Sequence, residues 1–156
     1  MAGQQGFTSR LLWSVNTAVQ RTNERVAGIT GTNPVQLGFY KAMMIQVSVS
    51  VNTNLGLTKL RVYSTFTGNA GQNNFPTPGD DTTPIILHSP AAPLAAGQAV
   101  TMIACQRASD GTFAPSGEQV FGNWYVLEYS TAAAGATPSL IFAVSAIFLS
   151  QPLSLE

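Results

Sequence analysis

Hydrophobic and polar residues alternate along two neighbouring segments of the chain. Between positions 43 and 52 the odd-numbered residues are apolar and the even-numbered residues, apart from Met44, are polar. A repeat of two residues is that of a β-strand buried on one face, and no helix would sort these residues in that way. Segment 57–66 alternates in the same manner, with Lys59, Arg61 and Tyr63 on its polar side.

Residues 53–56 join these two segments and contain the Asn and Gly that are typical of tight turns, which predicts a β-hairpin. Segments rich in Gly, Pro, Asn and Asp separate the other strand candidates. These candidates are residues 35–40, 85–88, 99–106, 120–129 and 140–149. Short strands with this punctuation predict an all-β fold, a single antiparallel β-sandwich or jelly roll.

The N-terminal segment has a pattern that fits both a helix and a strand. Residues 9–25 place apolar side chains such as Leu11, Leu12 and Val15 at helical spacings, yet their β-branched content also suits a strand. We favour the strand. The predicted organisation is an extended N-terminal arm, or else a first strand or short helix, over residues 1–25, followed by the β-sandwich domain over residues 26–156.

A long segment without regular structure is predicted between residues 68 and 84, which include three prolines and almost no apolar residue. Connections longer than about 12–15 residues are uncommon in compact domains unless they bind something or are disordered. We therefore expect an exposed loop that serves as a contact arm.

Charge is scarce. The chain has 7 basic and 7 acidic residues among 156, or 9%, whereas soluble domains usually carry about 25%. Net charge normally keeps a compact chain monomeric through mutual repulsion, so a neutral chain is expected to be a subunit of an assembly. Arg10, Arg21 and Arg25 are close in sequence, but the cations form no stripe for nucleic acid, and we expect a protein contact there.

Few residues offer catalytic or metal chemistry. The single cysteine, Cys105, lies in an apolar run and the single histidine, His88, ends one, so packing or a hydrogen bond is expected for each. Asp80–Asp81 has the composition of a solvated turn and lacks a calcium-loop pattern. Glu118 and Glu128 occupy opposite ends of one predicted strand, too far apart for paired carboxylate catalysis. The prediction is no enzyme, no cofactor and no metal.

The N-terminal residues have neither the basic region nor the apolar stretch of a secretory signal, so the chain is expected to mature in the cytoplasm. The longest apolar run, residues 140–149, is about half of the roughly 20 residues that cross a bilayer as a helix. No membrane partner is predicted.

Aromatic residues allow a carbohydrate-binding alternative, because sugar rings stack on exposed Trp and Tyr. Trp124, Tyr125 and Tyr129 alternate along one segment, which is equally the pattern of a central strand with buried rings. Near the chain start, Trp13 follows two leucines, and an apolar arm that docks on a neighbouring subunit would use all three.

This nearly uncharged β-protein has a Gly/Gln-rich N-terminus, a long Asn/Pro/Gly loop and strands faced with Ser and Thr. In these respects it resembles the small decoration (cement) proteins of tailed-bacteriophage capsids. The resemblance implies a β-sandwich or jelly-roll subunit, usually a homotrimer, that is made in the host cytoplasm and located in the virion. Such a subunit sits at three-fold positions on the expanded capsid and locks adjacent major capsid proteins together.

The sequence of this chain itself predicts two sets of contact residues. The predicted capsid contacts are Gln4, Phe7, Arg10, Leu11, Leu12, Trp13, Arg21 and Arg25. The predicted oligomer contacts are Gln46, Ser48, Ser50, Phe142, Val144 and Phe148. The alternatives are a jelly-roll shell subunit, a tail or fibre head domain, a carbohydrate-binding module or an unrecognised enzyme.

Overall fold

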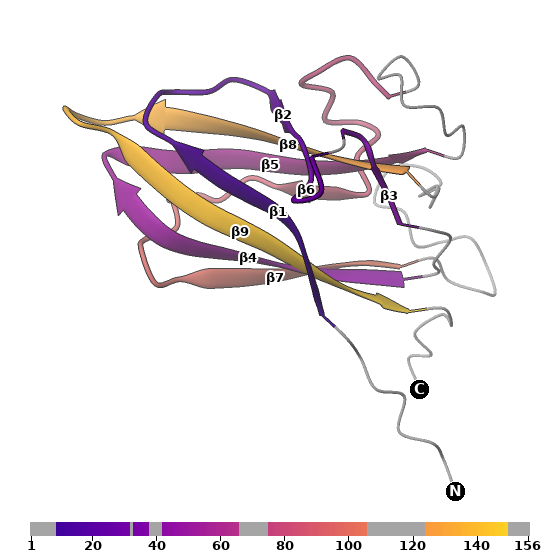
Figure 1. The fold of residues 1–156 in the computed structure, drawn as a ribbon. Helices are drawn as coiled ribbons and strands as arrows, with labels where there is room; N and C mark the ends of the chain where they lie inside the picture. The colour runs from indigo at the N-terminus through magenta and orange to yellow at the C-terminus, as the bar shows by residue number, and fades with distance from the viewer. Residues whose placement is uncertain (1–8, 32, 38–41, 66–74, 106–123, 150–156) are drawn as a thin grey trace, which may run out of the picture.

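A computed structural model of the chain describes residues 9–31, 33–37, 42–65, 75–105 and 124–149. Within these residues the chain forms strands and no helix, in two antiparallel sheets, which confirms the predicted all-β sandwich (Figure 1). The strands are β1 (Arg10–Thr17), β2 (Glu24–Val26), β3 (Val35–Gln36), β4 (Ala42–Thr53), β5 (Leu55–Thr65), β6 (Ile86–His88), β7 (Ala99–Cys105), β8 (Trp124–Ala133) and β9 (Ser139–Leu149).

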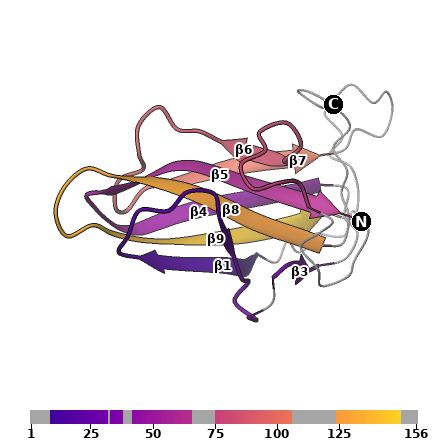
Figure 2. The same cartoon turned by 90° about the horizontal axis from the view of Figure 1, so that it is seen from above.

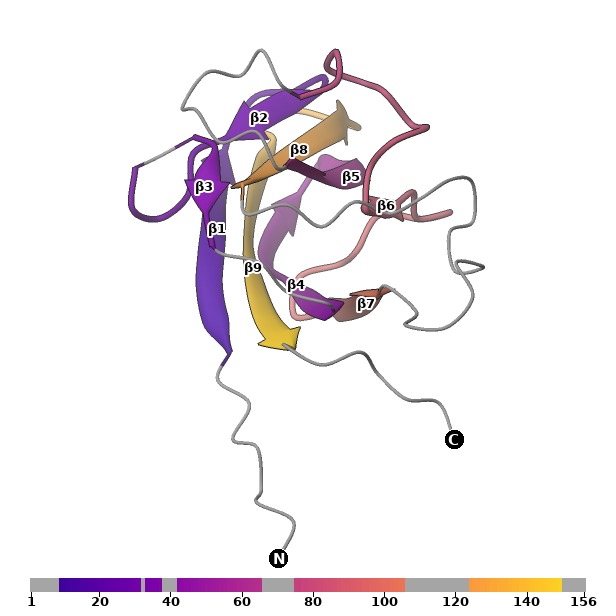
Figure 3. The same ribbon diagram turned by 90° about the vertical axis from the view of Figure 1, so that its right-hand side faces the viewer.

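The two sheets pack face to face. Sheet A has the strand order β1-β9-β4-β7, and sheet B has the order β2-β8-β5-β6, with β3 also paired to β8. Seen from above, the long strands of both sheets run the length of the molecule (Figure 2). Seen from the end, the layers are distinct, and the edge strands β6 and β7 lie on the same side of the sandwich (Figure 3).

The core lies between the sheets and follows the predicted alternation of β4. Met43, Ile45, Val47 and Val49 are buried, whereas the polar residues between them face outward. A bulge between Val49 and Val51 interrupts the alternation, so the last predicted core residue of this strand is only half-buried.

The predicted hairpin between β4 and β5 is wrong. The two strands are consecutive but belong to different sheets, and the chain crosses between the layers at Asn54, whose φ is +50°. The Asn54 side chain donates to the Ala136 carbonyl at 2.8 Å, and the Ala134 N–H donates to the Asn54 carbonyl at 2.9 Å. These bonds tie this crossing to the one between β8 and β9. A tight turn reverses the chain both in a hairpin within one sheet and in a crossing between two sheets. Alternation of apolar and polar residues therefore does not distinguish a hairpin from a crossing.

The N-terminal segment forms a strand, not a helix. β1 pairs with β9, and a bulge between Leu11 and Trp13 inserts Leu12 as an extra residue. Both Leu12 and Trp13 therefore face the core, although neighbouring strand residues normally point to opposite faces. Because β1 belongs to sheet A and β2 to sheet B, the predicted boundary at residue 25 divides the second strand of the sandwich.

The remaining predicted strands are present with altered ends. β3 is shorter than predicted, with residues 38–40 outside the described residues, and β6, β7 and β9 lie close to their predicted positions. β8 begins at Trp124 and continues to Ala133, so the predicted strand residues 120–123 also fall outside the description. β8 is an inner strand of sheet B, as the aromatic pattern predicted.

Candidate interaction surface

The outward side of sheet A carries no acidic or basic side chain in the described part of the chain, apart from Arg10 at the start of β1. We call this surface the A face. It consists of the residues of four strands that point away from the core: Leu11, Ser14, Asn16, Met44, Gln46, Ser48, Ser50, Ala99, Thr101, Ile103, Ile141, Ala143, Ser145 and Ile147. All of them are exposed or half-buried, and their side chains are small hydroxyl, amide or aliphatic groups.

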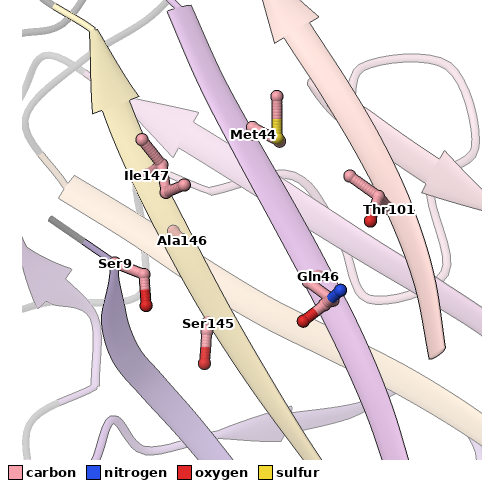
Figure 4. A pocket seen from close by; sticks show the side chains of 7 residues that line it. All are labelled: Ser9, Met44, Gln46, Thr101, Ser145, Ala146 and Ile147. Carbon is pink, nitrogen blue, oxygen red and sulfur yellow. The ribbon is translucent and has the colours of Figure 1, made fainter. Parts of the chain in front are cut away.

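A shallow hollow of about 120 Å³ lies in the A face (Figure 4). Its lining comes from β4, β7, β9 and the residue before β1, namely Ser9, Met44, Gln46, Thr101, Ser145, Ala146 and Ile147. Gln46 contributes an amide, three residues contribute hydroxyl groups, and Met44 and Ile147 contribute apolar surface. Such a lining can accept and donate hydrogen bonds and pack against apolar groups, but it holds no group for acid–base chemistry.

Charged residues are concentrated on the other sheet. The acidic and basic side chains of the described residues, again apart from Arg10, lie in sheet B or in the segments that pack on it. They are Arg21, Glu24, Arg25, Lys59, Arg61, Asp80, Asp81 and Glu128. Apart from Arg10, the charged side chains of the described residues therefore lie on one side of the sandwich, and the described A face is neutral.

Glu128 of β8 is the centre of this charged cluster and is fully buried, with 0% of its surface exposed. Its carboxylate accepts from Arg25 Nε at 3.2 Å, Arg61 Nη1 at 3.0 Å and the Gly79 N–H at 2.9 Å. The Tyr63 hydroxyl also lies 3.5 Å from Oε1. A buried charge is tolerated only when it is paired and hydrogen-bonded in this way. Because both carboxylate oxygens are occupied inside the protein, we assign Glu128 a structural role.

The cluster fastens residues 75–84 onto sheet B. Phe75 is buried with Tyr63 and Val126, the Arg25 guanidinium donates to the Pro76 carbonyl, and the Tyr63 hydroxyl donates to the Asp80 carbonyl at 2.6 Å. The described residues of the predicted exposed loop, 75–84, form a loop of which about half the residues are exposed, and its use as a contact arm stays a prediction. Its backbone is bonded to the sheet, and residues 68–74 lie outside the described residues.

Gly79 lies in close contact with Asn23 where residues 75–84 pack on sheet B. Its φ is +93°, which disfavours any side chain, and a Cβ atom there would lie 2.6 Å from Asn23 Nδ2. Asn23 in turn accepts from Arg61 Nη1 at 3.0 Å. The segment therefore reaches Glu128 only because glycine stands at this position.

Asp81 is an exposed residue of a bend, as the sequence predicted, and it also forms two ion pairs that the sequence did not predict. It accepts from Lys59 Nζ and from Arg61 Nε, each at 2.6 Å, and the hydrogen bond from Lys59, followed by that from Arg61, lowers the pKa of its carboxyl. Asp80 accepts from the hydroxyl groups of Thr82 and Thr83, and the pKa of its carboxyl is lowered chiefly by the bond from Thr82.

These pKa shifts predict a loss of stability in acid. A carboxyl whose pKa is lowered on folding contributes stability above its unfolded pKa, about 3.9 for Asp, and loses it as the pH falls through the lower folded value. Below about pH 4, the midpoint of urea unfolding should fall less steeply with pH for Asp81→Asn than for the wild type. Equal slopes for the two proteins in this range would show that Asp81 contributes nothing to the acid response.

The predicted capsid contacts are divided by the structure. Arg10 and Leu11 are exposed on β1, and Arg21 is partly exposed beside Glu24 at 3.9 Å. Leu12 and Trp13 are corrected to core residues because of the bulge in β1, and Arg25 is corrected to a partner of Glu128. Gln4 and Phe7 lie outside the described residues.

The predicted oligomer contacts are also divided. Gln46, Ser48 and Ser50 lie on the A face. Phe142 and Val144 are corrected to core residues, and Phe148 packs against the core with its ring 6.2 Å from that of Tyr125. The outward residues of β9 are instead the alternate set, Ile141, Ala143, Ser145 and Ile147. Both sets are largely apolar, so the sequence contained little signal to choose between them.

The other candidate groups have structural surroundings. Tyr125 and Tyr129 are buried and Trp124 is partly exposed, so the aromatic row is not available to stack on a sugar. His88 ends β6, and burial lowers the pKa of its imidazole, whose Nε2 is buried without a hydrogen-bond partner among the described residues. Cys105 ends β7, and its side chain lies outside the described part, as does Glu118.

Two further observations concern the described residues as a whole. They contain no group of three or more His, Cys, Asp or Glu side chains placed to hold a metal ion. Nor do they include a helix of the length and apolar character needed to cross a membrane.

Comparison with models of known protein families gives no match, and no curated protein matches the chain in sequence.

Proposed function

We propose that the chain is a structural subunit of a virion, a capsid decoration protein that binds the outer surface of the expanded shell through its A face. The observation that carries this proposal is the separation of charge between the two sheets. A neutral surface of hydroxyl, amide and aliphatic side chains can be covered by a partner without leaving unpaired charges at the interface.

The mode of action requires no catalysis. A ligand that binds only one state of a particle stabilises that state by mass action. If the A face fits a site that exists only where expanded capsid subunits meet, each bound copy adds its binding free energy to the mature lattice. The partners in this proposal are the major capsid protein and further copies of the chain, and the location is the virion surface.

Two features support the A face over sheet B as the shell-binding side. The outward side of sheet B is already partly covered by residues 75–84, which are held by Glu128 and Tyr63. The A face has no such cover among the described residues, and its hollow at Gln46 offers a place for a protruding side chain of the shell.

The proposal is tested by cosedimentation with shells assembled from the major capsid protein encoded in the same genome. The wild-type chain should sediment with expanded shells and remain in solution with unexpanded ones. Gln46→Lys should weaken binding by roughly a hundredfold, because an unpaired charge buried at an interface costs several kcal/mol.

Thr77→Lys is the matched control, since it adds the same charge on the exposed surface over sheet B. It should bind like the wild type, and circular dichroism should show both variants folded. Equal binding by Gln46→Lys and the wild type would contradict the assignment of the A face. A wild-type chain that builds an extended lattice by itself would instead favour the shell-subunit alternative.

A further inference from the structure

The edge strands of the two sheets differ in how well they are protected against pairing with another chain. Exposed edges present unpaired N–H and C=O groups, and proteins usually protect them with charges, prolines, bulges, short length or a covering segment. Three of the four sheet edges formed by the described strands have such protection. β2 and β6 have only 3 residues each, and β1 has a bulge, Arg10 at its start, and a bond from the Ile29 N–H to the Leu12 carbonyl.

β7 is the exception. Its 7 residues, Ala-Val-Thr-Met-Ile-Ala-Cys, include no charge and no proline, and its register with β4 runs from Ala99 to Cys105 without a bulge. Ile103 is exposed over 55% of its surface. Within the described part of the chain β7 pairs with β4 alone, and we call its other side the open side.

The ladder with β4 determines which backbone groups face this open side. The Val49 N–H donates to the Gln98 carbonyl at 2.9 Å, so Gln98 faces β4. Because successive strand residues present their backbone groups to opposite neighbours, Ala99, Thr101, Ile103 and Cys105 direct theirs to the open side. An added strand would find an uninterrupted row of donors and acceptors.

We infer that β7 pairs in antiparallel fashion with β7 of a second copy of this chain. The other edges are protected, so β7 is the edge that a second copy can offer. In the fully overlapping register Met102 lies on the two-fold axis, Thr101 lies opposite Ile103 of the second copy, and Ala99 lies opposite Cys105. The pairs Thr101–Ile103 and Ala99–Cys105 join residues whose backbone groups face the open side, so these pairs can form hydrogen bonds. The central pair of two Met102 residues is not hydrogen-bonded.

Side-chain burial favours the same partner. Val100 and Met102 point toward the core and pack against it, yet both remain partly exposed. A second β7 would cover them with the same apolar side chains, and no charged group would lie opposite a like charge. The two sheets would join into one, and their A faces would form a continuous neutral surface.

This inference does not depend on the proposed function, because it concerns self-association alone. Pairing of identical strands is isologous and gives a dimer. Sedimentation equilibrium of the purified full chain should therefore approach twice its mass of 16.4 kDa as the concentration rises. A monomer at all concentrations would overturn the inference, and so would a trimer, the oligomer that the resemblance implies.

Two β7 variants and one control identify the contact. Ile103→Lys introduces a charge at an exposed position of the edge, and Thr101→Pro removes an N–H that faces the open side; each should abolish the dimer. Gln46→Lys leaves this edge unchanged and should dimerise like the wild type, which separates this result from a failure of shell binding. Dimers of unchanged mass in the Ile103→Lys variant would contradict the inference.

Hydrogen exchange gives a second measurement that needs no variant. The amides of Thr101 and Ile103 face the open side, so they should exchange quickly in dilute protein and at least tenfold more slowly in concentrated protein. The amide of Met102, which faces β4, should change much less. Equal exchange of the Thr101 and Ile103 amides at both concentrations would exclude pairing through β7.

Discussion

Replacing Glu128 by glutamine should lower the free energy of unfolding by about 3–5 kcal/mol, the usual cost of removing one partner from a buried ion pair. The change retains the volume of the side chain but leaves the guanidinium groups of Arg25 and Arg61 without their shared carboxylate. Both arginine side chains are almost completely buried, so water cannot replace the lost partner. Urea denaturation followed by far-UV circular dichroism measures the difference.

Glu24→Gln provides the control for this experiment. Glu24 pairs with Arg21 at 3.9 Å on the surface, and exposed pairs of this kind contribute about 0–1 kcal/mol. Each substitution removes one carboxylate charge that faces arginine. The difference between their losses in free energy of unfolding therefore measures the effect of burying the ion pair. If Glu128→Gln costs no more than Glu24→Gln, the buried cluster does not hold residues 75–84 on sheet B.

Trp13→Ala should cost about 3–5 kcal/mol, as is typical for a fully buried tryptophan. Trp13 is 0% exposed and lies opposite Val144 in the pairing of β1 with β9, so its removal would leave a large cavity in the core. If residues 1–25 were instead an arm separate from the sandwich, the same change would have little effect on stability. The midpoint of urea unfolding distinguishes these cases.

Two companion variants make the result specific to burial. Leu11→Ala alters a side chain on the same strand that is 44% exposed, and it should change stability by less than about 0.5 kcal/mol. Trp13→Phe keeps most of the packing and removes a buried N–H that has no acceptor among the described residues, so it should cost much less than Trp13→Ala. Equal losses for Leu11→Ala and Trp13→Ala would contradict the core position of Trp13.

The fold class was predictable because β4 alternates so regularly that only one face could be buried. Connectivity was not predictable from the same pattern. Asn54 reverses the chain, but the choice between pairing β5 with β4 and sending it to the other sheet depends on long-range pairing with β8 and β9. Local turn residues contain no information about those partners.

The polar side of β5 shows a second limit. Lys59, Arg61 and Tyr63 alternate with apolar residues, which predicts a solvated face, yet Arg61 and Tyr63 are buried. They are covered because residues 75–84 return over them and bring Gly79 to Glu128. A loop predicted from its proline and asparagine content gave no indication that it would dock, since the groups that hold it come from distant strands.

The A face was predicted only in part. Gln46, Ser48 and Ser50 were identified because β4 alternates between apolar and polar residues, whereas β9 is apolar on both sides and its inward set was chosen instead of its outward set. A difference of one residue in a strand exchanges its two faces. The separation of charge between the sheets became visible only once the strand order was known.

Oxidation of Met44 in free and shell-bound protein tests the central proposal most directly. Met44 lines the hollow in the A face, and its neighbour Met43 is 0% exposed and serves as an internal reference. Under limiting peroxide, mass spectrometry should show Met44 sulfoxide forming several times more slowly on shells than in solution, with Met43 slow in both. Oxidation of Met44 at the same rate in both states would show that the A face stays open to water and that the shell is bound elsewhere.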